Sequence, residues 1–129
     1  MSEATWPQKV TAITLFVEDL ADCKRFYAEA FGLPVAYENE TSAVFMFGDL
    51  MVNLLAVTQA PGLIGPAPVG GAEAGRRFQL TVPVDDVDAL YAELTGRGVK
   101  FLNGPMDRPW GIRTAAFADP AGHVWELAK

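Results

Sequence analysis

The sequence predicts an α+β fold built from two successive β-α-β-β-β modules. The first observation is that one order of patterns occurs twice: a strand, a helix and then three extended segments. The second is that the strand-to-helix junctions match, since Val17-Glu18-Asp19-Leu20 corresponds to Val84-Asp85-Asp86-Val87. The helix ends match as well, with Phe31-Gly32-Leu33 corresponding to Arg97-Gly98-Val99. A repeat of this size constrains the whole chain, so it carries more weight than any single motif.

The first module is expected over residues 8–57. Its first strand alternates in polarity, and Asp19 then offers the N-cap of a helix that Gly32 ends. The turn pair Gly48-Asp49 separates its last two strands as a hairpin. The elements expected in this module are a strand, a helix and three extended segments, over residues 10–17, 20–31, 34–37, 43–47 and 50–57.

Residues 58–76 are rich in glycine, proline and alanine and show no periodicity, so they are expected to form a linker. The second module follows over residues 77–129. Its first strand covers residues 77–84, and Asp85-Asp86-Val87-Asp88 begins a helix that Gly96-Arg97-Gly98 ends.

The chain ends in a predicted β-hairpin, residues 109–127. In its turn, Asp119-Pro120-Ala121-Gly122, the proline presets φ and Gly122 supplies the positive φ that closes the turn. Alternation in the last strand places Val124 and Glu126 on the face opposite to Trp125 and Leu127. A carboxylate buried in such an apolar strand costs free energy unless it is paired, protonated or bound to metal. Glu126 is therefore the first candidate for a functional residue.

Composition and charge exclude several classes of protein. Half of the 129 residues are hydrophobic and 20% are charged, which indicates a well-packed globular domain. A net charge of −6 argues against nucleic-acid binding. The single cysteine, Cys23, excludes an internal disulfide. No segment has the length and hydrophobicity of a signal peptide or a membrane span, so a cytoplasmic protein without a membrane partner is expected.

Four segments carry a resemblance to a known family: Phe16-Val17-Glu18-Asp19-Leu20, Phe26-Tyr27, Phe31-Gly32-Leu33 and Phe117-Ala118-Asp119-Pro120-Ala121-Gly122-His123-Val124-Trp125-Glu126-Leu127. On these residues the chain resembles the vicinal oxygen chelate superfamily, which includes glyoxalase I, bleomycin-resistance proteins and extradiol dioxygenases. The resemblance implies mixed sheets that curve around a ligand cavity, with the helices outside.

Catalytic members of this superfamily hold a divalent metal on the inward faces of the first and last strands of each module. The matching positions here are Ala12, Asn53, Gln79 and Glu126, where the family uses His, Glu or Gln. Ala12 cannot bind metal, and Asn53 and Gln79 offer only neutral oxygens, whereas catalytic zinc or iron normally needs three stronger ligands. We therefore expect no metal cofactor. If a divalent metal is bound, Gln79 and Glu126 are its expected ligands.

Without a metal, Asn53, Gln79 and Glu126 can recognise a small molecule by hydrogen bonds. Phe16 is expected in the wall of the cavity, with Met51, Leu55, Phe45 and Phe47 as further wall candidates. Glu126 is also the one candidate catalytic residue, as a proton shuttle. The alternative is that Asn53, Gln79 and Glu126 only hydrogen-bond one another between the modules.

Further ligand contacts are expected from the loop before the last hairpin. Trp110 can stack on a planar ligand, or pack over the cavity mouth without one. Arg108 and Arg113 can bind an anionic group, or face solvent. His123, the only histidine, is expected to be a solvated turn residue.

The leading hypothesis is a protein similar to the bleomycin-resistance branch, which sequesters a small, partly aromatic molecule such as an antibiotic or toxin in a metal-free cavity. The alternative is a metal-dependent lyase, isomerase or dioxygenase of the same superfamily. The resemblance also implies a homodimer whose cavities form between modules of two chains. The sequence leaves open whether the modules pair within one chain or between chains.

Overall fold

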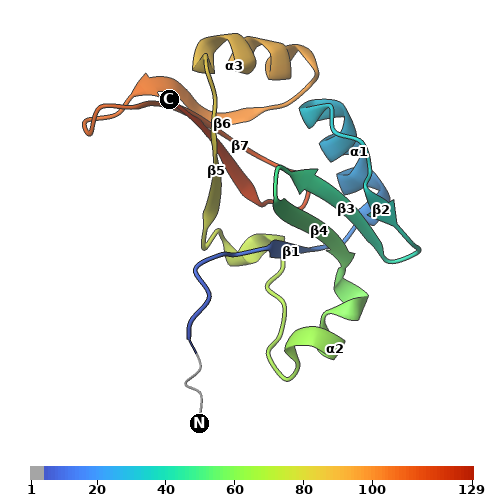
Figure 1. The fold of residues 1–129 in the computed structure, drawn as a ribbon. Helices are drawn as coiled ribbons and strands as arrows, with labels where there is room; N and C mark the ends of the chain where they lie inside the picture. Colours follow the sequence, from blue (N-terminus) through green and yellow to red (C-terminus); the bar gives the residue numbers. More distant parts are fainter. Residues whose placement is uncertain (1–4) are drawn as a thin grey trace.

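The computed structural model describes residues 5–129, apart from the side chain of Ala72, and contains two four-stranded mixed sheets (Figure 1). The strands of the first sheet are β1 (Ala12–Val17), β2 (Tyr37–Glu38), β3 (Ser42–Phe47) and β4 (Leu50–Ala56). Those of the second are β5 (Gln79–Pro83), β6 (Phe101–Asp107), β7 (Arg113–Ala118) and β8 (Val124–Ala128).

The two sheets have the same topology, which confirms the repeat predicted from the sequence. Their strand orders are β1-β4-β3-β2 and β5-β8-β7-β6. In each, the first strand pairs in parallel with the last, and the remaining pairs are antiparallel. Each module is therefore one β-α-β-β-β unit.

The helices begin and end where the sequence predicts. In α1 (Leu20–Phe31), the Asp19 carboxylate accepts a hydrogen bond from the backbone N–H of Asp22, at 3.0 Å. Asp86 caps α3 (Val87–Gly96) in the same way. Gly32 follows α1 at φ 68°, a left-handed conformation that costs glycine little.

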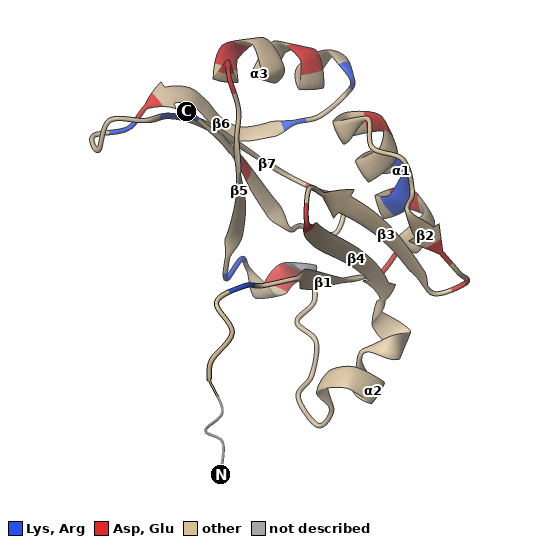
Figure 2. Cartoon of the chain, viewed as in Figure 1, with Lys and Arg blue, Asp and Glu red and all other residues tan. Residues whose placement is uncertain are grey.

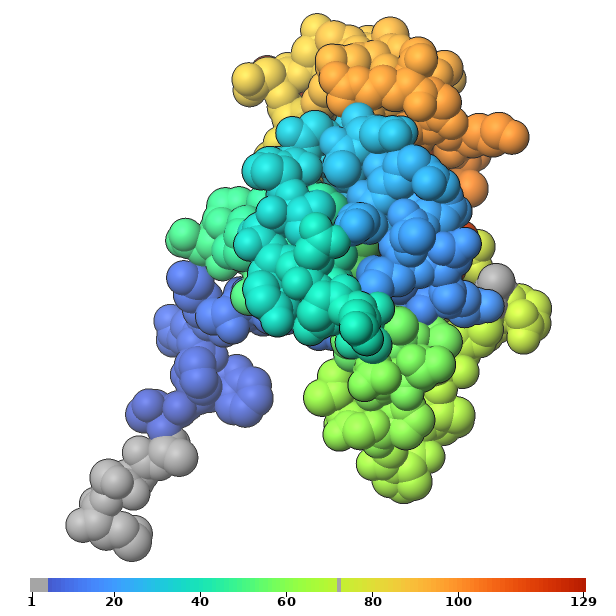
Figure 3. All heavy atoms as spheres, turned by 90° about the vertical axis from the view of Figure 1, so that its right-hand side faces the viewer, coloured from blue at the N-terminus to red at the C-terminus, as the bar shows by residue number. Residues whose placement is uncertain are grey.

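One aromatic core joins the two modules. Rings of α1 contact both sheets, with centroids 5.6 Å apart for Tyr27 and Phe45 and 5.1 Å apart for Phe31 and Trp125. Phe47 of the first sheet stacks on Trp125 of the second, at 5.0 Å. The helices thus cover one face of each sheet, and these covered faces share the core. Figure 3 shows the outer side of α1 at the surface, below α3.

The segment between the modules is more ordered than the predicted linker. It holds the four-residue helix α2 (Pro61–Ile64) and two 3-10 turns, Val57–Gln59 and Ala72–Ala74. Elements this short bury too few apolar residues to leave a periodic pattern in the sequence. No helix within residues 5–129 is long and apolar enough to cross a membrane.

Strand β6 (Phe101–Asp107) is irregular. It extends to Asp107, and its register against β7 shifts on both sides of Asn103. Gly104 allows β7 to approach closely, because a Cβ there would lie 2.5 Å from the carbonyl oxygen of Thr114. These irregularities change which residues of β6 share a face, and that affects the candidate site.

Candidate functional site

The faces turned away from the shared core carry most of the predicted site residues. Register places Gln79 and Glu126 on one face of the second sheet, which we call the Glu126 face. Ala12, Phe16 and Asn53 lie on the equivalent face of the first sheet, the Asn53 face. The predicted alternation of the strands is confirmed at these positions.

A row of polar residues crosses the Glu126 face. Register places Asn103 of β6 beside Ala116 of β7, Ala116 beside Glu126, and Glu126 beside Thr81 of β5. The hydroxyl of Thr81 donates a hydrogen bond to Oε1 of Glu126, at 2.9 Å. Glu126 is half-buried. Its direct partner is therefore Thr81, because Gln79 pairs with Val124, two residues before Glu126.

Arg108 lies over the same face. Its Nε donates to the hydroxyl of the buried Thr114 at 2.8 Å, and its Nη2 donates to Oδ1 of Asn103 at 3.2 Å. Thr114 faces the same side as Ala116 and Glu126, since it lies two residues before Ala116 on β7. Two neutral acceptors hold the guanidinium in place, and no carboxylate in the described part of the chain forms an ion pair with it.

Trp110 belongs to this arrangement through Arg108. The guanidinium carbon of Arg108 lies 5.9 Å from the centroid of the indole ring, within the range of a cation–π contact. The indole is 68% exposed, so a planar molecule can reach it. Arg108 and Trp110 together form a charged and aromatic end of the polar row.

The Asn53 face is less polar. Register places Asn53 beside Thr14 of β1 and Val44 of β3. The Oδ1 atom of Asn53 is buried and has no hydrogen-bond partner among the described residues. Phe16 is half-buried, and Met51 is exposed on the same face. An unsatisfied buried oxygen of this kind is costly, so it indicates a place where a donor is missing.

Phe45 and Phe47 do not line this face, although the sequence suggested them as walls. Register pairs Phe45 with Val52, on the opposite side of the sheet from Asn53. Phe45 is completely buried, and Phe47 stacks on Trp125 in the core. The sequence interpretation did not apply strand alternation to the apolar residues 43–47, and it therefore placed Phe45 and Phe47 on the same face as Asn53.

The Asn53 face is turned away from the second sheet, and the Glu126 face is turned away from the first sheet. Since their opposite faces share one aromatic core, Asn53 and Glu126 lie on different sides of it. Ala12 and Gln79 are both exposed on their respective faces. Within one chain, the four family positions therefore do not meet over a common space between the sheets.

The donors on these faces do not fit a catalytic metal. Within residues 5–129 there is no group of three His, Cys, Asp or Glu side chains arranged to hold a metal ion. Glu126 already accepts a hydrogen bond from Thr81, and Asn53 offers a neutral oxygen on the other sheet. One carboxylate with neutral oxygens is a weak set for zinc or iron.

Arg113 lies on the other side of the second sheet. Its guanidinium forms two bonds of 2.8 and 2.9 Å to the Asp88 carboxylate and one of 2.9 Å to Asp107. The hydrogen bonds from Arg113 lower the pKa of Asp88 and raise that of Arg113 itself. Arg113 thus anchors the start of α3, and Arg108 is the arginine that lies beside Glu126.

His123 is also away from the Glu126 face, and it is not the solvated turn residue that the sequence predicted, because its side chain is only 17% exposed. Its Nδ1 lies 3.1 Å from Oδ2 of the buried Asp119, and Asp119 also accepts a 2.8 Å hydrogen bond from the Tyr27 hydroxyl. Burial, with the Asp119 charge adding to it, raises the pKa of Tyr27, so its hydroxyl stays protonated and donates. This network ties the last turn to α1.

Sequence reasoning missed Thr81 and Asn103, and it named Arg108 and Arg113 as candidates without separating them. The parallel register of β5 with β8 and the bulged register of β6 cannot be read from alternation. The sequence did contain one indication of the contact between Arg108 and Trp110. Arg108 lies two residues before Trp110, a spacing that lets both side chains reach the same surface.

Comparison with known proteins gives consistent matches. The family model of the Glyoxalase/Bleomycin resistance protein/Dioxygenase superfamily matches residues 9–127. The uncharacterized protein YraH of Bacillus subtilis is 35% identical over 125 residues, which cover 94% of this chain and 98% of that protein.

Solved structures share the fold. A glyoxalase/bleomycin resistance protein/dioxygenase from Nocardioides matches with a TM-score of 0.86 at 23% identity, over 97% of this chain and 85% of the other. A glyoxalase-related enzyme from Fulvimarina pelagi matches with a TM-score of 0.81 at 26% identity, over 95% of this chain and 88% of the other.

Proposed function

Since this chain belongs to the Glyoxalase/Bleomycin resistance protein/Dioxygenase superfamily, we propose that it binds a small, partly aromatic molecule on the Glu126 face, in a metal-free cavity. The ligand presents an acidic group to Arg108, a planar ring to Trp110 and a hydrogen-bond donor to Glu126. Sequestration of an antibiotic or toxin is the physiological role that follows from such binding.

The observation that carries this proposal is the placement of Arg108. Its guanidinium is fixed by Thr114 and Asn103, beside an exposed indole, and it forms no ion pair with a carboxylate within residues 5–129. Arginine N–H groups match the geometry of carboxylate and sulfonate oxygens, and charge-assisted hydrogen bonds are about twice as strong as neutral ones.

The distance between Asn103 and Glu126, in the polar row across the Glu126 face, sets the length of the ligand. Glu126 and Asn103 are two strands apart, and neighbouring strands lie about 4.8 Å apart, so about 10 Å separates them. That distance fits a bicyclic aromatic molecule with an acidic group at one end and an amine or hydroxyl at the other.

We further propose that a second copy of the chain completes the cavity, and that the protein acts as a cytoplasmic homodimer. The Glu126 face and the Asn53 face of one chain lie on different sides of its core, so a shared cavity needs faces from two chains. A partner's Asn53 face would bring an unsatisfied amide oxygen and exposed Met46 and Met51 to the Glu126 face.

The test is a fluorescence titration with 6-amino-2-naphthoate, a planar probe with an acid and an amine at opposite ends, compared with 2-naphthoate. We expect Arg108→Gln to weaken both probes about tenfold, because one charge-assisted interaction is worth about 1.4 kcal/mol or more. Glu126→Gln should weaken only the amino probe. The control is Arg25→Gln, which removes a charge on α1 that pairs with Asp22.

Equal affinity of both probes for wild type and Arg108→Gln would exclude this face as the binding site. Thermal melts of all variants establish that the differences do not come from unfolding. Glu126 and Arg108 are half-buried and hydrogen-bonded, so each substitution is expected to lower the free energy of unfolding by about 0.5–2 kcal/mol, which the melts separate from loss of binding.

The second candidate function is a metal-dependent lyase, isomerase or dioxygenase. The observation that favours it is the buried Oδ1 of Asn53, which lacks a donor among the described residues and is an oxygen that a metal ion could use. Metal analysis of protein purified without chelator separates the two. One equivalent of a divalent metal per chain supports the enzyme, and absence of metal supports the binding protein.

A further inference from the structure

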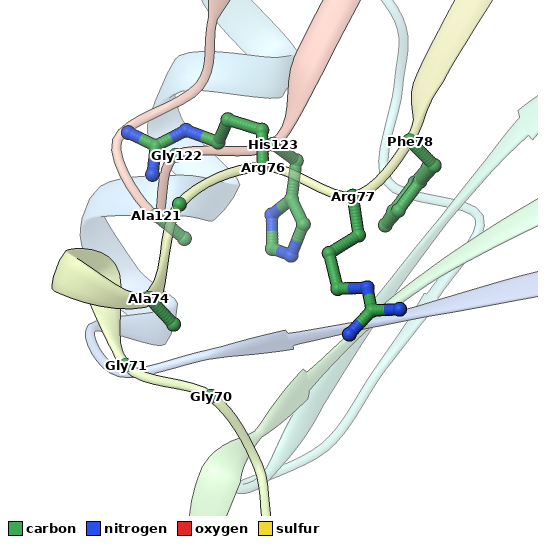
Figure 4. Close-up of a pocket in the computed structure, with 10 residues that line it drawn as sticks. Gly70, Gly71, Ala74, Arg76, Arg77, Phe78, Ala121, Gly122 and His123 are labelled. Atoms are coloured by element: carbon green, nitrogen blue, oxygen red, sulfur yellow. The ribbon is translucent and has the colours of Figure 1, made fainter.

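A pocket of about 220 Å³ lies where the linker meets the last turn (Figure 4). Its walls are the backbone of Gly70, Gly71 and Gly75 and the side chains of Arg77, Phe78 and His123. His123 follows the alternation of Trp125, so this pocket opens on the face opposite to Glu126. It is therefore separate from the proposed ligand cavity and independent of it.

The pocket concentrates positive charge in an acidic protein. Arg76 and Arg77 adjoin in the sequence and both line the pocket, at the entry to β5 (Figure 2). Within residues 5–129, Arg77 forms no ion pair. Five other basic residues do pair with carboxylates: Lys9, Lys24, Arg25, Arg97 and Arg113.

His123 adds a directed nitrogen. Nδ1 is oriented by the buried Asp119 carboxylate, which leaves Nε2 to face the pocket. Figure 4 shows the imidazole ring pointing into the pocket, toward the side chain of Arg77. The ring of Phe78 lies 6.2 Å from the imidazole, centroid to centroid, and supplies an apolar wall.

Several wall residues are glycines. Gly122, at φ 95°, makes room for Arg76, since a Cβ on Gly122 would lie 2.9 Å from the guanidinium carbon of Arg76. Residues without side chains let a ligand approach the backbone amides directly. Opposing charge comes from Asp119, which holds Nδ1 of His123, and from Glu73, whose carboxylate oxygen lies 2.8 Å from where a Cβ of Gly71 would be.

We propose that this pocket binds a phosphate group, with Arg77 and the Nε2 side of His123 as its direct contacts. A phosphate carries up to two negative charges and several acceptor oxygens for the Arg77 guanidinium. With Nδ1–H held by Asp119, Nε2 of a neutral His123 accepts from a P–OH group, and Nε2 of the imidazolium form donates to a phosphate oxygen. A volume of about 220 Å³ is smaller than a pocket for a drug-sized ligand, which is about 300–1,000 Å³. It fits free phosphate or the phosphate end of a small ester, with Phe78 beside the organic part.

The test uses His123 as its own reporter. Because it is the only histidine, its imidazole protons give a single set of proton NMR signals. We expect a saturable shift of these signals with inorganic phosphate at constant pH and ionic strength, and no such shift with sodium chloride. Arg77→Gln should weaken the apparent affinity at least tenfold, and Glu73→Gln should strengthen it. Arg25→Gln, the matched control on α1, should leave it unchanged.

Binding of phenyl phosphate distinguishes a site for free phosphate from a site for a phosphate ester. Tighter binding than inorganic phosphate assigns the pocket to an aromatic phosphate ester that contacts Phe78, and equal binding assigns it to free phosphate. A shift that does not saturate, or one that Arg77→Gln leaves unchanged, would overturn the proposal. Arg77 and Glu73 are both exposed, so their substitutions are expected to leave the fold intact.

Discussion

Glu126 and Arg108 differ in how far the sequence alone could identify them. Glu126 is an acid in an apolar strand, and strand alternation predicted its face correctly. Its partner, Thr81, depends on the parallel register between β5 and β8, which alternation does not define. Arg108 follows a bulged strand, so its face could not be derived from the sequence at all.

Cys23 illustrates a residue whose chemistry is set by burial. It is 1% exposed, and burial, with the Asp119 charge adding to it, raises the pKa of its thiol from 9.0 to about 12. We expect no reaction with Ellman's reagent in the folded protein at pH 8, and one reactive thiol in 6 M guanidinium chloride. Rapid stoichiometric labelling of the folded protein would contradict this burial.

The same shift predicts a pH dependence of stability. Between about pH 9 and pH 12 the unfolded chain loses the Cys23 proton while the folded chain keeps it. The stability that the neutral thiol contributes is therefore complete below pH 9 and falls as pH rises toward 12. Chemical denaturation of wild type and Cys23→Ala over pH 8–10 measures this difference, which should narrow as pH rises.

At the scale of elements, the last turn and α1 are joined by one buried network. The Trp125 Nε1–H donates to the Tyr27 hydroxyl at 3.0 Å, and that hydroxyl donates to Asp119 at 2.8 Å. The sequence predicted the turn from Asp119-Pro120-Ala121-Gly122 and the cap from Asp19, because both are local. It did not predict this network, because its members are more than 90 residues apart.

Tyr27→Phe tests the contribution of that network. The substitution leaves the indole N–H of Trp125 and one oxygen of Asp119 short of a partner in a buried site. We expect a loss of about 1–3 kcal/mol in the free energy of unfolding, measured by urea denaturation. The matched control is Tyr37→Phe, at a 59% exposed tyrosine, with an expected change below about 0.5 kcal/mol. Equal effects of the two substitutions would show that the network adds no stability.

At the scale of the whole molecule, the repeat was enough to predict two similar sheets, and the structural matches confirm that architecture. The relative placement of the modules was not predictable. It depends on contacts between distant aromatic rings, such as Phe47 on Trp125 and Phe31 on Phe117. That placement separates the Asn53 face from the Glu126 face, and so it determines whether one chain can form the cavity.

The proposed dimer gives a prediction at this scale. We expect light scattering to report a dimer at micromolar concentration, with a total buried area of at least about 1,200 Å². Met51→Glu places a charge on the exposed Asn53 face and should yield monomers that still fold. Ala21→Glu, on the exposed side of α1, should leave the dimer intact. A wild-type monomer would restrict binding to the Glu126 face of a single chain.

The most direct test of metal-free recognition is the affinity of 6-amino-2-naphthoate before and after exhaustive dialysis against EDTA. If Arg108, Trp110 and Glu126 recognise the probe by themselves, the dissociation constant should stay within a factor of two. Loss of binding after chelation, with recovery on adding one equivalent of a divalent metal, would contradict the account.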